Sequence, residues 1–437
     1  MSTTRTRAEA EDEGESAARA PVIPVTMQAL VLDGIGFEHL AVRSVPTPHP
    51  GPRQLLARVD AAGICSSILK IIDQGSRHPM LFGWDVTKHP LILGDEGSIT
   101  LVEIGEQVRG RYQLGQRYVI QAAVDHGPIN HPERYRDNGR GIERLGVGYT
   151  LPGHLAEYML VTEEILEAQC LLPLQDRPLP YAHAALSEPL ACIISGHDHH
   201  MHLVQETPLS PRGVLKGLRP GGVTVIIGAG TMGRMHVDLA LSYRPRVVVS
   251  VDHHDERLEQ VRRLFGGRAL KLGTTLLTVN SNATDLKELV GTLTDGRGAD
   301  DVIVAAGSGK AIEAAQELAA RYAVLHLFGS LRKGEDIINL NTTTVHYREI
   351  NVTGSAGGSP WDVARALDLM TSGELDPGAH ISLIGELGHV IELLKQAKAR
   401  LIEGKAVVYP HRRTGEIRAV HSWSAEDERA YLAGGGS

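Results

Sequence analysis

VTVIIGAGTMGRMHVDLALSYRPRVVVSVD, residues 223–252, is the stretch that decides the fold of this chain. Its first five residues form a β-branched run of the kind that a fully buried parallel strand shows. A helical pattern follows, and a second β-branched run, Val247–Val251, closes the unit. The turn between the first run and the helix carries three glycines in the spacing G-x-G-x-x-G, at Gly228, Gly230 and Gly233. This order of strand, glycine turn, helix and strand predicts a dinucleotide-binding unit.

The glycine turn and the start of the helix make a site for a pyrophosphate. The glycines allow a tight turn, a close approach of backbone to phosphate and close packing of helix on strand. Thr231 and Met232 begin the helix, whose unpaired N–H groups and partial positive charge would hold the phosphates. A glycine-rich turn in another kind of α/β unit stays the alternative.

The acid at the end of the second strand indicates which nucleotide binds. Asp252 follows Gly233 by 19 residues, where a carboxylate accepts hydrogen bonds from the adenosine ribose. The same carboxylate would repel a 2′-phosphate, so the sequence predicts NAD(H) rather than NADP(H). His253 and His254 follow the acid and could soften that discrimination.

The bulk properties narrow the class of protein. At 437 residues the chain is long enough for two domains with separate cores. The net charge of −8, without a clustered basic stripe, argues against nucleic acid as a partner. No apolar run reaches the roughly 18 residues that span a bilayer. Cys65, Cys170 and Cys192 are an odd and sparse set, which indicates a reducing cytoplasm without a disulfide framework.

The remaining pattern divides the chain into two domains and two tails. Short strands broken by Gly and Pro, from about residue 26 to 161, predict a small irregular barrel. After Asp252 strands alternate with amphipathic helices, as in a doubly wound parallel sheet. We expect the active site in the cleft between the two domains. The expected boundaries are an N-terminal disordered tail at 1–24, the catalytic domain at 25–190 and 355–411, the nucleotide-binding domain at 191–354 and a C-terminal tail at 412–437.

Several further segments stand in a characteristic order. They are GIC at Gly63–Cys65, LGDEGS at Leu93–Ser98, LAEY at Leu155–Tyr158, SEPL at Ser187–Leu190 and GKAVVYPH at Gly404–His411. With the nucleotide motif, they make the chain resemble the medium-chain dehydrogenase/reductase (zinc-type alcohol dehydrogenase-like) family over about residues 27–411. The likeness is closest to its polyol branch, with sorbitol dehydrogenase, and to L-sorbose-1-phosphate reductase-like proteins. The resemblance implies an α/β fold class, a GroES-like β-barrel catalytic domain plus a Rossmann domain.

The resemblance also implies a catalytic zinc site. In the polyol branch the metal is held by the cysteine of GIC and by the histidine and glutamate of a G-H-E segment, with the glutamate of the E-P segment close by. Carried over, these residues become Cys65, Asp95, Glu96 and Glu188, as metal ligands and catalytic residues. Asp95 departs from the family histidine. A carboxylate is an acceptable zinc ligand, but so anionic a set would weaken the pull of the metal or favour harder ions. A metal-free, hydrogen-bonded site is the alternative.

A second departure follows the cysteine. Where the family commonly has C-G-[ST]-D-x-H, this chain has Cys65-Ser66-Ser67-Ile68-Leu69-Lys70. Ser67 keeps the hydroxyl that relays the substrate proton in the family. Lys70 replaces the histidine, which fits a substrate with an anionic group that Lys70 meets. The four closely spaced cysteines of the family's structural zinc lobe do not occur, so we expect no structural zinc.

The remaining candidates are weaker. We expect Gly307, Ser308, Phe328, Gly329 and Ser355, at the carboxyl ends of later strands, to touch the nicotinamide half of the cofactor. A group of histidines, His197, His199, His200 and His202, invites a metal site, but no acid has the spacing to complete it, which favours a solvated or capping cluster. His154 is expected on a strand surface or facing the cleft. Cys170 and Cys192 are expected to be buried apolar residues.

Together these features predict an NAD-dependent oxidoreductase that interconverts a secondary alcohol and a ketone on a polyol, sugar phosphate or cyclitol. The low aromatic content favours a hydrophilic small-molecule substrate. The cysteines indicate a cytoplasmic protein, and the charge and the lack of a long apolar run argue against nucleic acid and membrane as partners. The resemblance suggests a homodimer or homotetramer. Two alternatives stay open. One is a metal-free relative that uses bound NAD in acid–base, epimerase- or lyase-like chemistry. The other is a protein that binds NAD(H) without turnover.

Overall fold

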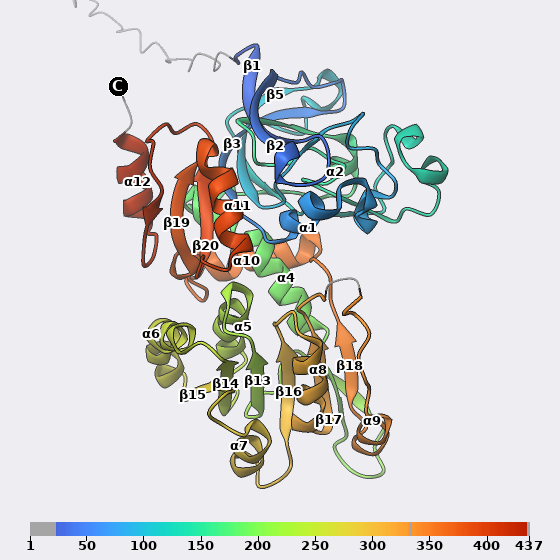
Figure 1. Ribbon diagram of the computed structural model, residues 1–437, viewed down its shortest axis with the longest axis vertical. Coiled ribbons are helices and arrows are strands. Elements are labelled where there is room, and N and C mark those ends of the chain that lie inside the picture. The colour runs from blue at the N-terminus through green and yellow to red at the C-terminus, as the bar shows by residue number, and fades with distance from the viewer. Residues whose placement is uncertain (1–22, 332–333, 435–437) are drawn as a thin grey trace, which may run out of the picture.

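The computed structural model describes residues 23–331 and 334–434, and most of the predicted N-terminal tail lies outside this range. A β-rich lobe and an α/β lobe meet along α4 (Ser187–Asp198), which lies at the waist of the molecule (Figure 1). The predicted fold class is confirmed. In the described part of the chain, no helix has both the length and the apolar composition that crossing a membrane requires.

The β-rich lobe is an eight-stranded barrel sheet with two smaller sheets beside it. The barrel order is β10-β6-β5-β3-β20-β19-β21, and β9 also pairs with β3. Its strands are β3 (Leu55–Gly63), β5 (Gly97–Ile104), β6 (Arg117–Ile120), β9 (Tyr158–Val161), β10 (Leu171–Pro173), β19 (Ile381–Glu386), β20 (Lys405–Tyr409) and β21 (Arg418–Ala419). The smaller sheets are β2 (Leu40–Pro46), β1 (Thr26–Leu32) and β4 (Leu91–Ile92), and the pair β7 (Ala123–Asp125) and β8 (Arg144–Gly146).

The chain leaves this lobe through α4 and returns to it late. β20 pairs antiparallel with β3, so the last part of the sequence completes the sheet begun by the first. The helices of the lobe are α1 (Ser67–Gln74), α2 (Glu163–Glu167), α3 (Tyr181–Ala185), α10 (Pro360–Thr371), α11 (Val390–Lys398) and α12 (Ala425–Ala433).

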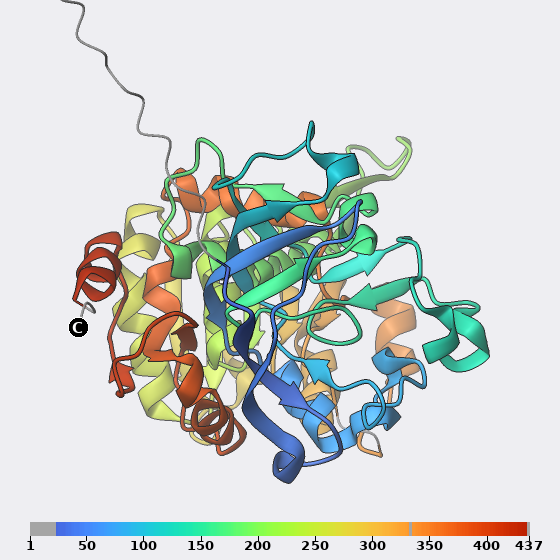
Figure 2. The same cartoon turned by 90° about the horizontal axis from the view of Figure 1, so that it is seen from above.

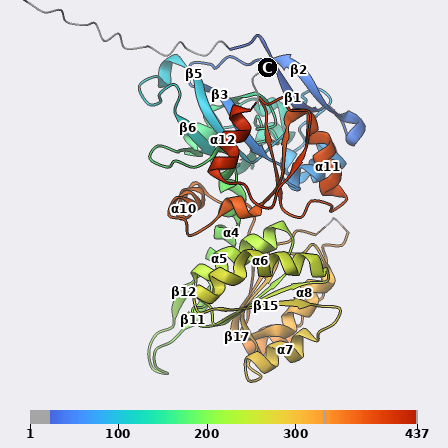
Figure 3. The same ribbon diagram turned by 90° about the vertical axis from the view of Figure 1, so that its left-hand side faces the viewer.

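The α/β lobe is a six-stranded parallel sheet in the order β15-β14-β13-β16-β17-β18. Its strands are β13 (Val223–Ile227), β14 (Val247–Asp252), β15 (Thr275–Asn280), β16 (Ala299–Val304), β17 (Ala319–Leu327) and β18 (Asn351–Gly354). The helices are α5 (Thr231–Ser242), α6 (Asp255–Lys271), α7 (Leu286–Leu293), α8 (Gly309–Ala315) and α9 (Thr342–Arg348), and they flank the sheet (Figure 3). Every residue of β14 and β16 is buried, and apart from Ser250, Asp252, Asp300 and Asp301 these residues are apolar.

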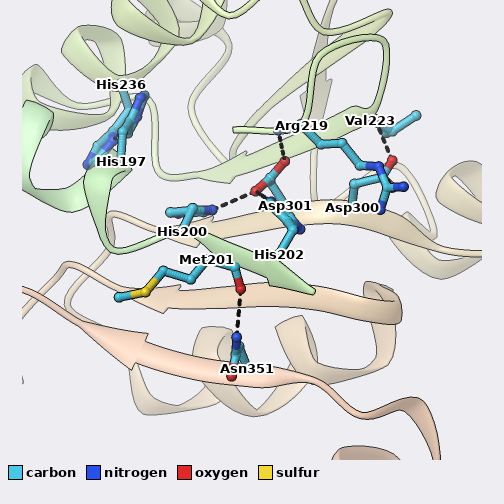
Figure 4. A network of polar contacts seen from close by, with 10 residues as sticks. All are labelled: His197, His200, Met201, His202, Arg219, Val223, His236, Asp300, Asp301 and Asn351. Carbon is cyan, nitrogen blue, oxygen red and sulfur yellow. Dashed lines mark hydrogen bonds and ion pairs between the residues drawn. The ribbon is translucent and has the colours of Figure 1, made fainter. Parts of the chain in front are cut away.

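A buried polar anchor joins a hairpin to this sheet (Figure 4). The hairpin, β11 (Met201–Val204) and β12 (Gly213–Lys216), follows α4 and has no clear signal in the sequence. Asp301 of β16 lies 2.6 Å from His200 Nδ1 and 2.9 Å from His202 Nε2, and it accepts the Arg219 backbone N–H at 2.9 Å. The anchor therefore ties the end of α4, the hairpin and the sheet together.

This anchor corrects the expectation for the histidine group. His197, His200 and His202 are fully buried, so these three are neither solvated nor capping residues, whereas His199 lies at the C-terminal cap of α4, with its Nδ1 2.7 Å from the Ser195 carbonyl oxygen. His197 Nε2 lies 3.0 Å from His236 Nδ1 of α5, and His200 stacks on His326 of β17. Local spacing could not reveal this arrangement because Asp301 lies 101 residues beyond His200.

Burial keeps several imidazoles neutral. It lowers the pKa of His197 and His236 well below the ordinary value, that of His154 to about 4 and that of His326 to about 3. Below its ordinary pKa of about 6.5 each imidazole gains a proton on unfolding, so the free energy of unfolding falls as the pH falls.

We therefore predict acid sensitivity between pH 6.5 and 5. With one pKa unit equal to about 1.4 kcal/mol, His154 and His326 together predict a loss of about 3 kcal/mol over this interval. Urea denaturation at several pH values measures it, and His326→Gln should make the dependence shallower. A free energy of unfolding that stays constant over this interval would contradict the prediction.

The predicted C-terminal tail is in fact part of the β-rich lobe, up to residue 434. Its segment, red in Figure 2, contains β21 and α12. Trp423 and Tyr431 are buried in a core cluster with Tyr409. The charged residues between them obscured this short apolar pattern in the sequence.

A buried carboxylate of α12 explains this docking. Glu428 Oε1 accepts the backbone N–H of Tyr181 at 2.6 Å, and Oε2 accepts that of Ala182 at 2.8 Å. The Tyr409 hydroxyl also donates to Oε2, at 2.7 Å. Glu428 thus caps α3, whose first N–H groups lack partners within the helix.

Glu428→Ala should lower the free energy of unfolding by about 2–4 kcal/mol, because it leaves these three buried donors unpaired. Glu426→Ala, at an exposed position of the same helix, is the matched control and should change it by less than about 0.5 kcal/mol. Urea denaturation of both variants checks this, and equal small effects would show that α12 does not cap α3.

Candidate active site and nucleotide cradle

Three of the predicted metal ligands converge at one end of the barrel. Cys65 follows β3, and Asp95 and Glu96 lie between β4 and β5. The Cys65 sulfur and one carboxylate oxygen from each acid lie within 4.8 Å of one another. The fold therefore brings the thiol of Cys65 close to two carboxylates that lie about 30 residues further along the chain.

Close backbone packing fixes the turn that carries the two acids. Gly94 has a φ of +111°, and a Cβ there would lie 2.7 Å from the Leu155 nitrogen. His154 donates its backbone N–H to the Gly94 carbonyl at 2.9 Å. The His154 side chain is fully buried against Gly97. The expectation that it lies on a strand surface or faces the cleft is therefore wrong.

Glu188, the fourth predicted ligand, lies just outside this group. It is buried in the first turn of α4, and the Cys192 thiol donates to its Oε1 at 3.4 Å. Burial, followed by the charges of Asp95 and Glu96, raises the pKa of Glu188 well above its ordinary value. Cys192 is only partly buried and hydrogen-bonded, so its expected role as a buried apolar residue is wrong, whereas Cys170 is buried as predicted.

The sequence gave no reason to expect a buried lysine in this cluster. Lys405, at the start of β20, forms a buried ion pair with Glu96 Oε1. Although burial alone would lower it, the charge of Glu96 raises the pKa of Lys405, which stays an ammonium. One signal was available in the sequence: Lys405 begins a strongly apolar strand, which indicates burial. A buried lysine requires an acidic partner, so this position could have predicted an ion pair.

The donor set fits a divalent cation. Asp95 Oδ1 and Glu96 Oε2 are buried and accept no hydrogen bond among the described residues. Burial, then the charges of Asp95 and Glu96, raise the pKa of the Cys65 thiol well above its ordinary value. A metal ion would hold Cys65 as a thiolate and would balance the carboxylates that the single ammonium of Lys405 leaves uncompensated. Sulfur and oxygen donors are ligands that zinc accepts. Cys65 Sγ, Asp95 Oδ1 and Glu96 Oε2 are the atoms that could hold it.

The residues after Cys65 lie beside this group. Ser67, the first residue of α1, donates its hydroxyl to Asp95 Oδ2 at 2.7 Å. Lys70, one helical turn later, donates to the Ser330 hydroxyl of the α/β lobe. Tyr149, which the sequence did not single out, lies close enough for burial and the charges of Asp95 and Cys65 to raise its pKa. Hydroxyl groups and one ammonium thus lie next to the thiol and carboxylates, and the ammonium contacts the other lobe.

The glycine turn forms the cradle predicted for a dinucleotide. Gly228 has a φ of +105°, and any side chain at Gly233 would collide with the Gly228 carbonyl. Asp252 Oδ2 accepts the Ala229 N–H at 2.8 Å. Burial opposes ionisation of Asp252, but hydrogen bonds from Ala229, His254 and His253 and the charge of Arg257 bring its pKa below the ordinary value. A carboxylate therefore lies directly beside the turn.

The edge residues lie where the strand pattern placed them. Gly307 and Ser308 follow β16, Phe328 and Gly329 follow β17, and Ser355 follows β18. These carboxyl ends border the crevice of a doubly wound sheet. The Thr231 hydroxyl also donates to the Gly404 carbonyl at 3.0 Å, which joins the start of α5 to the loop before Lys405.

Two family models match the two lobes. Residues 51–170 match an alcohol dehydrogenase GroES-like domain, and residues 231–372 match a zinc-binding dehydrogenase. The chain belongs to the zinc-type alcohol dehydrogenase family.

Full-length relatives of this family agree. The uncharacterised Escherichia coli K12 protein YggP is 31% identical over 82% of this chain and 80% of its own length. A mannitol-1-phosphate 5-dehydrogenase of Aliivibrio fischeri is 27% identical over 86% of this chain and 85% of its own. A solved structure of a Sinorhizobium meliloti zinc-binding dehydrogenase bound to NADP is 26% identical, with a TM-score of 0.66 over 88% of this chain and 99% of that one.

The donor set predicts about one zinc ion per chain after reconstitution and desalting. Cys65→Ala removes the only sulfur donor of the three and should abolish retention. Cys170→Ala, a buried cysteine remote from the group, is the control and should retain the metal. Plasma emission spectrometry measures the content, and equal zinc in both variants would place the metal elsewhere.

Proposed function

We propose that the protein catalyses the reversible NAD-dependent oxidation of a secondary alcohol to a ketone on a polyol, sugar phosphate or cyclitol. Membership of the alcohol dehydrogenase family supports the reaction type. The observation that carries the proposal is the position of Ser67, whose hydroxyl donates to Asp95 of the metal-binding group. The name of the mannitol-1-phosphate relative supports a polyhydroxylated substrate.

The chain's own residues bind and orient the reacting alcohol. Ser67 donates to Asp95, so its oxygen lone pairs remain to accept the proton of a substrate hydroxyl. Lys405 holds Glu96 by one oxygen and leaves the other facing the group. Zinc held by Cys65, Asp95 and Glu96 would supply Lewis acidity that lowers the pKa of a nearby hydroxyl, and NAD would supply the hydride acceptor.

The edge residues of the sheet complete the geometry. We propose that Ser308, Phe328 and Ser355 orient the nicotinamide toward the cleft, because they follow strands on the far side of β13 from Asp252. As Ser67 accepts the substrate proton, its hydroxyl turns from Asp95 and releases its own proton toward the ribose hydroxyls of the cofactor and solvent. Holding the alcohol and the nicotinamide in this alignment raises the rate, because a reaction between two bound groups no longer depends on their meeting in solution.

NAD rather than NADP is the proposed cofactor. The buried carboxylate of Asp252 beside Ala229 supports this choice, since a 2′-phosphate there would meet a negative charge. We further propose a cytoplasmic homo-oligomer. The free cysteines support the compartment, and exposed apolar side chains around the edge strand β18, including Val352, Met201 and Tyr347, support self-association.

A panel of polyols, polyol phosphates and cyclitols with NAD, followed by the absorbance of NADH, tests the reaction. Ser67→Ala should lower kcat by about 100-fold, because it removes the proton-transfer hydroxyl, while Ser67→Thr should retain most activity. Turnover only of hydrophobic primary alcohols would contradict the proposal. Activity that survives complete removal of metal would favour the metal-free alternative.

A further inference from the structure

One charged side chain in the cleft has no role in the reaction as derived above. Lys70 lies on α1, three residues after Ser67, so the two side chains share one face of the helix. Ile68, Ile71 and Ile72 of the same helix are buried and fix it against the core of the lobe. The proton-relay hydroxyl and the ammonium therefore project from neighbouring positions of one fixed helix.

The charges around Lys70 differ from those around Lys405. Lys405 is paired with Glu96 in the interior. Within the part of the chain that the structure describes, no carboxylate lies within 4 Å of the Lys70 ammonium, and its polar partner is the neutral hydroxyl of Ser330. A half-buried ammonium with a hydroxyl beside it is suited to an anionic ligand.

The order of the sheet shows which ligand that anion would belong to. Asp252 ends β14 on one side of β13 and marks the adenosine half of the cradle, and the pyrophosphate belongs at the start of α5. Ser330 follows β17, which lies two strands away on the other side of β13. An anion at Lys70 therefore lies beyond the nicotinamide side of the cradle, where the substrate enters.

We propose that Lys70 and Ser330 form a subsite for the phosphate group of a phosphorylated polyol. The subsite deepens the proposed function and rests on it, since it selects one substrate class among polyols, sugar phosphates and cyclitols. The metal-binding acids would repel a phosphate, so the reacting carbon lies at their end and the phosphate at the Lys70 end. Because the two lobes contribute one residue each, the phosphate also bridges them when it binds.

The test compares phosphorylated and free polyols of the same carbon chain, such as mannitol 1-phosphate and mannitol, within a set of four- to six-carbon pairs. Lys70→Met should lower kcat/KM for the phosphorylated member by about 10- to 100-fold and leave the free polyol within about threefold. Lys70→Arg should retain most of the preference. Lys398→Met removes a lysine that pairs with Asp73 on the outer side of the same helix, and it should change neither value.

Other outcomes would overturn the subsite. If Lys70→Met slows both members of each pair equally and shifts the pH profile, Lys70 acts in proton transfer. If it weakens NADH binding instead, Lys70 serves the cofactor or domain closure. Wild-type turnover of free polyols without a phosphate preference would refute the subsite and leave the proposed function intact.

If the protein turns over neither member of any pair, the result counts against the proposed function. Isothermal titration calorimetry then tests the subsite by measuring the binding of both members. The complex of the wild-type protein with NADH should then bind a phosphorylated polyol at least tenfold more tightly than the free polyol, and Lys70→Met should remove this difference. Equal affinity, or no binding of either member, would refute the subsite as well.

Discussion

The buried ion pair between Glu96 and Lys405 is the contact on which the rest of the active site depends. Its partners lie 309 residues apart, one from the start of the β-rich lobe and one from its return after the nucleotide lobe. The pairing of β3 with β20 brings them together. Removing one partner would leave an uncompensated charge in the interior, which is among the most destabilising changes in a protein. The pair thus makes catalysis depend on completion of the barrel.

The remaining donors are placed by backbone contacts rather than by flexible side chains. Gly94, Gly148 and Gly153 approach neighbouring backbone so closely that no side chain fits between them, and this packing fixes the turn carrying Asp95. Across the cleft, the Gly228–Gly233 contact fixes the nucleotide turn in the same way. The contact of Thr231 with Gly404 then joins the two rigid halves. Such precision suits a reaction whose rate depends on the alignment of donor and acceptor carbons.

The sequence predicted what depends on neighbouring residues. The strand, glycine turn, helix and acid of the nucleotide unit lie within 30 residues, and their local pattern specifies their conformation. The convergence of Cys65, Asp95 and Glu96 was foreseen only through the resemblance to a family, because nothing local links residue 65 to residue 95. Lys405 beside Glu96, Asp301 beside His200 and Glu428 beneath α3 were missed, since each joins segments about 100 or more residues apart. A buried charge can be recognised in a sequence only once its partner is known.

The thiol and carboxylates of the barrel are arranged to hold a metal ion that faces the nucleotide cradle. Anomalous diffraction at the zinc absorption edge, from crystals of the zinc-reconstituted protein with NADH, would locate this ion. We expect a single strong peak bounded by Cys65, Asp95 and Glu96, next to a nicotinamide ring held between Ser67 and Ser308. A peak at another position, or an empty group with the Cys65 sulfur turned away from both acids, would contradict it.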